Sequence, residues 1–166
     1  MTQTMIIDTD TGSDDAVALI MALRAPHVDV RAITVVAGNV PLLQGSRNAR
    51  YTVELCGATV PVSEGAARPL LREPFCATYF HGEDGLGDQG YPPPRTPPAP
   101  GHAASVLVET IRAHPGLTLV TLGPLTNIAL ALLHAPYLAA KVGRCVLMGG
   151  AACTVGNVTP AAEYNI

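Results

Sequence analysis

The sequence predicts an α/β fold, a predominantly parallel sheet with helices on both faces. Three observations predict it: short apolar runs alternate with segments of helical periodicity, the run at 30–38 is almost continuously apolar, and polar residues follow the ends of the runs. Continuously apolar strands are typical of parallel sheets because helices cover both faces. The chain has 166 residues, 48% hydrophobic and 14% charged, which indicates one globular domain over residues 1–166.

The first two predicted strands each lead into a helix. Residues 5–7 (MII) are short and apolar, Gly12 supplies a tight turn, and residues 13–24 place apolar side chains at helical spacing. Residues 30–38 (VRAITVVAG) form a second strand, and residues 41–56 can supply the helix that crosses back over the sheet. This order of strand, turn and helix is the repeating unit of a parallel sheet.

The same order continues in the second part of the chain. Residues 60–65 (VPVSEG) predict a short third strand. The remaining elements are a helix at 102–114, a strand at 117–123, a helix at 124–133 and a strand at 143–150. Pro124, at the start of the helix at 124–133, is compatible with a first helical turn.

A long irregular segment interrupts this pattern. We interpret residues 65–91 as a loop at the functional site and residues 92–100, which hold six of the fifteen prolines, as a stiff extended connector. A linker between two domains is less favoured, because the strand–helix order resumes with too few residues for a second core.

Charge and cysteine usage exclude several classes of protein. The net charge is −3 and the ten basic residues are scattered, which argues against a nucleic-acid polymer as partner. The four cysteines form no C-x-x-C pair and the first residues do not form a signal peptide, so we expect a cytoplasmic protein with free thiols. The most apolar stretch, 117–140, is broken by glycine and proline and makes a poor membrane span, so we expect no membrane association.

Four carboxylates lie within eight positions after the first predicted strand. Ser13 as N-cap and a helix dipole that favours acids in the first turn explain two of them without any function. They do not explain the other two. The four residues are Asp8, Asp10, Asp14 and Asp15.

Such a cluster needs a positive partner. Each close pair of like charges repels by about 1 kcal/mol in water and roughly 4 kcal/mol at an effective dielectric near 20. Arg24 is the nearest basic residue and should lie more than two helical turns away. A bound cation is therefore the simpler counter-charge, and hard oxygen ligands without a zinc-type His/Cys set suit Ca²⁺ or Mg²⁺.

The motif DTDTGSDDA (8–16) resembles the N-terminal fingerprint of the calcium-dependent nucleoside hydrolases of the inosine–uridine-preferring type, Asp-x-Asp-x-Gly-x-Asp-Asp. Four more stretches continue the resemblance in order: VVAGNV (35–40), HGEDGLGD (81–88), TLGPLTNIA (121–129) and MGGAACTVGNVTPAAEYNI (148–166). The resemblance implies an open Rossmann-like core, Ca²⁺ as cofactor, and hydrolysis of the N-glycosidic bond of purine or pyrimidine ribonucleosides to ribose and free base, as in purine salvage.

The resemblance also implies residue roles. Asp10 would bind the metal and act as the base that activates water, with Asp15 and the backbone carbonyl of Thr126 as further ligands. Carboxylates near the sugar suit the reaction, because the transition state carries positive charge on the ribose ring. Asn39 would line the metal and ribose end, and His81 would lie in the loop that approaches the nucleobase. The ribose hydroxyls would contact Asp14, Asn157, Glu163 and Asn165.

Taken alone, several of these residues have ordinary structural explanations. Asn39 and Asn157 follow glycines and are typical of turns. Thr126 and Asn127, in the first turn of a helix, could be local capping residues, and His81 could be a solvated loop residue. The ordered set of motifs is what favours the functional interpretation.

Other readings stay open. Haloacid-dehalogenase-like phosphotransferases also follow a strand with an Asp-x-Asp pair, but their pattern requires Thr or Val where Gly12 stands. The chain resembles only the N-terminal half of a nucleoside hydrolase, so the alternative is a truncated or split fragment that is catalytically incompetent and binds metal or ribose weakly. The strand at 143–149 would then leave an apolar edge, and we expect a homo-oligomer or association with a C-terminal half.

Overall fold

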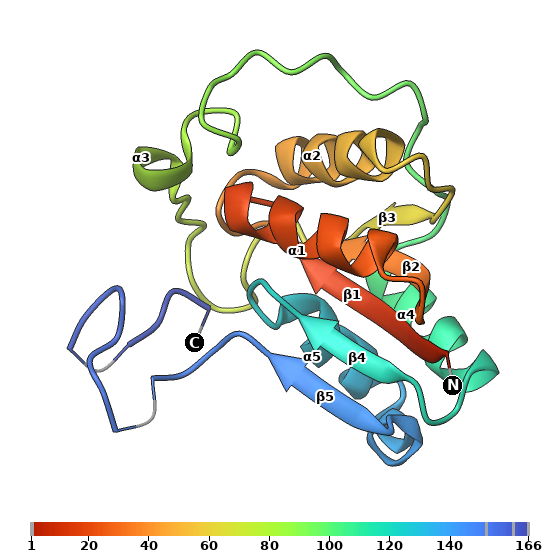
Figure 1. The fold of residues 1–166 in the computed structure, drawn as a ribbon. Coiled ribbons are helices and arrows are strands. Elements are labelled where there is room, and N and C mark those ends of the chain that lie inside the picture. Colours follow the sequence, from red (N-terminus) through yellow and green to blue (C-terminus); the bar gives the residue numbers. More distant parts are fainter. Residues whose placement is uncertain (1, 152, 161, 166) are drawn as a thin grey trace.

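The computed structural model describes residues 2–151, 153–160 and 162–165. Its sheet has five strands in the order β3-β2-β1-β4-β5, and every neighbouring pair is parallel. The carboxyl ends of the strands therefore meet at one edge of the sheet, and the arrowheads of β1, β4 and β5 point the same way in Figure 1. The strands are β1 (Gln3–Thr9), β2 (Val28–Val35), β3 (Val62–Glu64), β4 (Thr118–Thr121) and β5 (Arg144–Leu147).

Helices cover both faces of this sheet (Figure 1), which confirms the predicted α/β class. One face carries α1 (Ser13–Arg24) and α2 (Leu42–Leu55), and the other carries α4 (Ala103–Ala113) and α5 (Thr126–His134). The two remaining helical segments are a single turn, α3 (Thr78–His81), and a 3₁₀ helix, η1 (Pro136–Lys141). Within the described ranges, no helix combines the length and the apolar character needed to cross a membrane.

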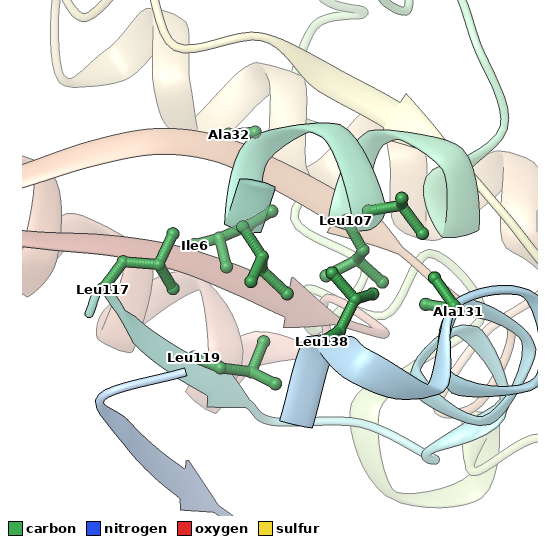
Figure 2. Close-up of a cluster of buried hydrophobic side chains, with 10 residues drawn as sticks. Ile6, Ala32, Leu107, Leu117, Leu119, Ala131 and Leu138 are labelled. Carbon is green, nitrogen blue, oxygen red and sulfur yellow. The ribbon is translucent and has the colours of Figure 1, made fainter. Parts of the chain in front are cut away.

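Strand β1 supplies side chains to two separate hydrophobic cores. Ile6 packs with Leu107 of α4 and Ala131 of α5, as Figure 2 shows. Its neighbour Ile7 packs on the opposite face with Leu19 of α1. Successive side chains of a strand point to opposite faces, so a strand covered on both sides must be apolar at consecutive positions. This is the physical reason for the continuous apolar run that precedes the acidic motif.

The start of α1 differs from the prediction. Gly12, not Ser13, is the N-cap, and Ser13 is the first helical residue. The carboxylate of Asp15 accepts a hydrogen bond from the Gly12 N–H at 2.9 Å. The backbone N–H at the start of the helix is therefore satisfied without a side-chain cap from Ser13. The side chain of Ser13 is thereby free to contact a distant residue of the site.

The later elements also differ in their bounds. Helix α5 begins at Thr126, two residues after Pro124, and η1 follows it where no element was expected. The proline-rich connector 92–100 contains no helix or strand and passes over α2 (Figure 1). Glu54 of α2 accepts hydrogen bonds from the N–H groups of Arg95 and Thr96 at 2.8 and 2.7 Å, so the connector is tied to the same domain.

Candidate functional site

The candidate site lies at the edge where the parallel strands end, which is where open α/β sheets bind ligands. The loop after β1, the loop after β2, helix α3 and the C-terminal segment all approach this edge (Figure 1). A cavity of about 480 Å³ opens between them. Among its lining residues are six of those named from the sequence: Asp14, Asp15, Asn39, His81, Asn157 and Asn165.

Two buried carboxylates are joined by one asparagine beside this cavity. The backbone N–H of Asn39 donates to Oδ2 of Asp10 at 2.7 Å, and its side-chain Nδ2 donates to Oδ2 of Asp15 at 3.1 Å. Asp10 is 1% exposed and Asp15 is 5% exposed. The structure thus brings together three of the predicted site residues, although Asn39 lies 29 positions from Asp10 and 24 positions from Asp15 in the sequence.

The pair is electrostatically unfavourable as it stands. Burial, reinforced by the negative charge of Asp15, raises the pKa of Asp10 well above its ordinary value. Burial also raises the pKa of Asp15, with a further contribution from Asp14. Among the described residues, the ion pairs involve Arg31 with Asp29 and His81 with Asp14, and neither places a Lys or Arg beside the buried pair.

These features fit a hard divalent cation. Oδ1 of Asp10 is buried and has no hydrogen-bond partner in the described part of the chain, so it is available as a ligand. Gly38 and Gly123 make room for this carboxylate: a Cβ on Gly123 would lie 2.7 Å from Oδ1, and a Cβ on Gly38 would collide with Oδ2. The described residues contain no group of three or more His, Cys, Asp or Glu side chains that could hold a metal.

The other two acids of the motif are not part of this close buried pair. Oδ2 of Asp8 accepts hydrogen bonds from Thr34 Oγ1 at 2.6 Å and from Asn127 Nδ2 at 2.9 Å. Burial raises the pKa of Asp8 to about 7. The side chain of Asp14 is 81% exposed and points into the open cavity. Only Asp10 and Asp15 form the close buried pair.

His81 is a wall of the cavity and not a solvated loop residue. It ends helix α3 and is 7% exposed. Its Nδ1 shares a hydrogen bond with Ser13 Oγ at 3.0 Å and lies 3.9 Å from a carboxylate oxygen of Asp14. Helix α1 and helix α3 therefore fix the ring between them, on the cavity that Asp15 also lines.

The C-terminal segment is folded on itself by its own polar side chains. The N–H of Asn157 donates to Glu163 Oε1 at 3.1 Å, and Oδ1 of Asn157 accepts from the N–H of Tyr164 at 2.9 Å. Asn165 Nδ2 donates to the carbonyl of Leu122 at 2.7 Å, which ties the segment to the end of β4. Asn157 and Asn165 are thereby presented to the first cavity.

Two of the predicted site residues line a neighbouring cavity instead. This second cavity, of about 590 Å³, is lined by Thr126 and Glu163 together with Asn165. Tyr164 lines both cavities, and its hydroxyl donates to the carbonyls of Gly38 and Phe75. Asp14 and His81 line the first cavity and Glu163 lines the second.

Sequence reasoning missed four residues that hold the site in place. Ser13 and Asn127 were interpreted as local capping residues, yet their hydrogen bonds reach residues 68 and 119 positions away. Buried Asn48 in the middle of α2 and the hydroxyl of Tyr164 gave no separate signal, because a polar residue inside a helix or loop is usually solvated.

The sequence and fold are similar to those of known nucleoside hydrolases. The family model "Inosine-uridine preferring nucleoside hydrolase" matches residues 5–166. A probable uridine nucleosidase 2 of Arabidopsis thaliana is 45% identical over 166 residues. A plant nucleoside hydrolase structure superposes with a TM-score of 0.95 at 41% identity, and a purine-preferring ribonucleoside hydrolase from Gardnerella vaginalis with a TM-score of 0.94 at 34% identity.

These matches cover almost all of this chain but only part of each relative. The covered share of this chain is 98% for the Arabidopsis protein and 99% for the plant structure, against 52% and 53% of the relatives themselves. The chain spans about half the length of the proteins it matches. On the extent of the family match and the identity over nearly every residue, this chain belongs to the inosine-uridine preferring nucleoside hydrolase family.

Proposed function

We propose that this chain takes part in hydrolysis of the N-glycosidic bond of ribonucleosides, which releases ribose and a free nucleobase. The observation that carries the proposal is the buried Asp10–Asp15 pair beside a cavity whose other polar groups suit a sugar. Oδ1 of Asp10 has no hydrogen-bond partner among the described residues. The proposal places the activity in the cytoplasm, as a step of nucleoside salvage.

The acidic pair would hold a Ca²⁺ ion. Asp10 and Asp15 supply the charged oxygens, and the backbone carbonyl of Thr126 is the proposed neutral ligand. When bound, Ca²⁺ would polarise water and neutralise the repulsion between the two carboxylates. Asp10 would then accept the proton of the attacking water, while the two hydrogen bonds from Asn39 keep both carboxylates in a fixed orientation.

The ribose would lie in the 480 Å³ cavity. Its hydroxyls are both donors and acceptors, and the exposed carboxylate of Asp14 and the amide groups of Asn157 and Asn165 offer the matching partners. Glu163, which lines the neighbouring cavity, is the further proposed ribose contact. Carboxylates around the ring would stabilise the positive charge that develops as the bond to the base breaks.

The nucleobase would lie on the side of His81. This ring faces the cavity and is fixed by Ser13, so it can contact a planar ligand without losing further side-chain entropy. Relatives of this chain carry names for uridine and for purine nucleosides. We therefore propose both purine and pyrimidine ribonucleosides as the substrate class.

The length of the matched relatives favours a second candidate for the chain by itself, a half-enzyme of low activity. Ca²⁺ takes six to eight oxygens at about 2.3–2.6 Å. The proposed ligands Asp10, Asp15 and the Thr126 carbonyl supply three or four of these. We propose weak Ca²⁺ binding by the chain alone, and full activity only in a homo-oligomer or with a polypeptide equivalent to the other half of its relatives.

The test is release of free base from inosine and from uridine, with Ca²⁺ and with a chelator. The parent chain is compared with Asp10→Asn and, as a matched control, with Asp29→Asn, whose carboxylate is exposed on β2. A second arm adds the polypeptide that corresponds to the other half of the Arabidopsis relative. We expect activity to need Ca²⁺, to rise on mixing, and to be lost in Asp10→Asn only. Equal activity of Asp10→Asn and the parent would overturn the proposed role of the pair.

A further inference from the structure

We infer that Asn127 is a positioning residue that sets the backbone carbonyl of Thr126 for metal binding. The inference rests on the function proposed above and deepens it. It starts from a buried amide side chain at the carboxyl edge of the sheet that makes three hydrogen bonds. Asn127 is 0% exposed and lies in the first turn of α5.

Asn127 connects three separate segments at this edge. Its Nδ2 donates to Asp8 Oδ2 at 2.9 Å and to the carbonyl of Val35 at 3.0 Å. Its Oδ1 accepts from the N–H of Ala66 at 2.8 Å. The partners lie in β1, at the end of β2 and just beyond β3, so one side chain joins the ends of three neighbouring strands.

The backbone around these bonds is built to admit the amide. A Cβ on Gly65 would collide with Oδ1 of Asn127, so only glycine allows the loop after β3 to approach this closely. The N-cap position of α5 is Leu125, which offers no side-chain hydrogen bond to the helix. Long-range bonds of Asn127 therefore hold the first turn of α5 where a local cap would ordinarily do so.

This anchor acts directly on Thr126. The carbonyl of Thr126 and the backbone nitrogen of Asn127 belong to one planar peptide unit. When the side chain fixes the position of Asn127, it also restricts the direction in which that carbonyl points. Asp8, the partner of the Asn127 amide, lies two residues before Asp10 on the same strand and loop. The anchor thus sets the carbonyl relative to the carboxylate with which it would share a cation.

Two substitutions separate this role from simple loss of stability. Asn127→Leu removes all three hydrogen bonds at similar volume. Thr34→Val is the matched control, because Thr34 donates to the same oxygen of Asp8 but lies in β2 and not in α5. Calorimetric titration with Ca²⁺, at a temperature where circular dichroism shows each variant folded, gives the affinity, and amide exchange at Ala66 reports directly on the lost bond.

Loss of an outer partner of a metal site typically weakens metal affinity by about 10–100-fold. We expect a loss in this range for Asn127→Leu, with faster exchange at Ala66, and a much smaller change for Thr34→Val. If the leucine variant does not fold, Asn127→Ser, which keeps one donor, replaces it and should show an intermediate loss.

Each other outcome overturns the inference. Unchanged Ca²⁺ affinity in Asn127→Leu removes the positioning role but leaves the proposed cofactor standing. An equal loss in Thr34→Val shows that the effect passes through Asp8 and not through α5. Absence of Ca²⁺ binding by the parent chain overturns the proposed cofactor itself, which distinguishes the two failures.

Discussion

At the scale of single residues, the acids of one motif have different environments. Asp8 is buried among neutral donors, Asp10 and Asp15 face each other, and Asp14 is exposed. A carboxyl group whose pKa is higher in the folded chain than in the unfolded chain keeps its proton longer when folded. Between the two pKa values, raising the pH therefore favours unfolding.

The pKa of Asp8 rises from its ordinary 3.8 to about 7 on folding, so we predict that the chain in chelator loses stability as the pH rises from about 4 to about 7. Asp8→Asn should reduce this slope because it keeps the shape and removes the titration of Asp8, while Asp10 and Asp15, whose pKa values are also raised, continue to contribute. Ca²⁺ should raise the melting temperature more at pH 7.5 than at pH 5, since its ligands must be deprotonated. Thermal melts at both pH values test this, and a parent that is steadily stabilised up to pH 7 in chelator would contradict it.

A second prediction at this scale concerns the space around Asp10. A Cβ at Gly38 would collide with Oδ2 of Asp10, so Gly38→Ala should lower the free energy of unfolding by about 1–3 kcal/mol, as overpacking does. It should also weaken Ca²⁺ binding by displacing the carboxylate. Gly150→Ala is the control, because a Cβ there meets open space. Urea unfolding and Ca²⁺ calorimetry should show a loss in the first variant only.

At the scale of elements, helix α2 is hydrogen-bonded to two loops of the site through one side chain. Asn48, 3% exposed, donates through Nδ2 to the carbonyl of Thr11 at 3.0 Å and to that of Asp84 at 2.8 Å. It also accepts a hydrogen bond from Gln44 at 2.9 Å. One side chain of α2 therefore holds the turn after Asp10 and the loop that follows His81 in a fixed relation.

We predict that Asn48→Leu releases the loop at 82–91. Leaving the Thr11 and Asp84 carbonyls without this partner should cost about 1–3 kcal/mol. The amides of Leu86 and Asp88, which donate to Asp84 Oδ1, should exchange faster. Gln44→Ala removes only the outer hydrogen bond and should leave both amides protected. Unchanged exchange in Asn48→Leu would show that other contacts hold the loop.

At the scale of the whole molecule, β5 is one of the two edge strands of the sheet, and β3 is the other. All four of its residues are exposed, and the run from Val146 to Met148 is apolar and 43–49% exposed. An exposed apolar edge strand presents unpaired backbone groups and pairs readily with another chain. The edge expected from the sequence is thus present in the structure, next to the segment that carries Asn157 and Glu163.

We predict that the chain associates with a second copy through β5. Size-exclusion chromatography with light scattering should show a dimer that dissociates on dilution. Val146→Lys should shift the equilibrium to the monomer, because a charged lysine on an edge strand disfavours pairing with another strand. Met21→Lys, at a residue 69% exposed on α1, is the control and should leave the dimer intact. A parent that is monomeric at every concentration would contradict the prediction.

Local features of the chain were predictable because their signals lie close together in the sequence. The period of apolar residues predicted the order of strands and helices, since each element needs its own pattern of buried positions. The parallel sheet followed from continuous apolar runs such as 30–38, and it placed the loops after Thr9 and Val35 at one edge. Family motifs then singled out Asp10, Asp15 and Asn39, which the fold brings into contact.

What no local pattern contains is the pairing of distant polar groups. Asn127 and Asp8 are 119 residues apart, and their hydrogen bond exists only because β4 and α5 return beside β1. The burial of His81, the placement of Glu163 and Asp14 in different cavities, and the carboxylate oxygen of Asp10 that has no hydrogen-bond partner among the described residues have the same origin. Burial and hydrogen bonding depend on which segments exclude water together, and that is a property of the packed molecule, not of any stretch of its sequence.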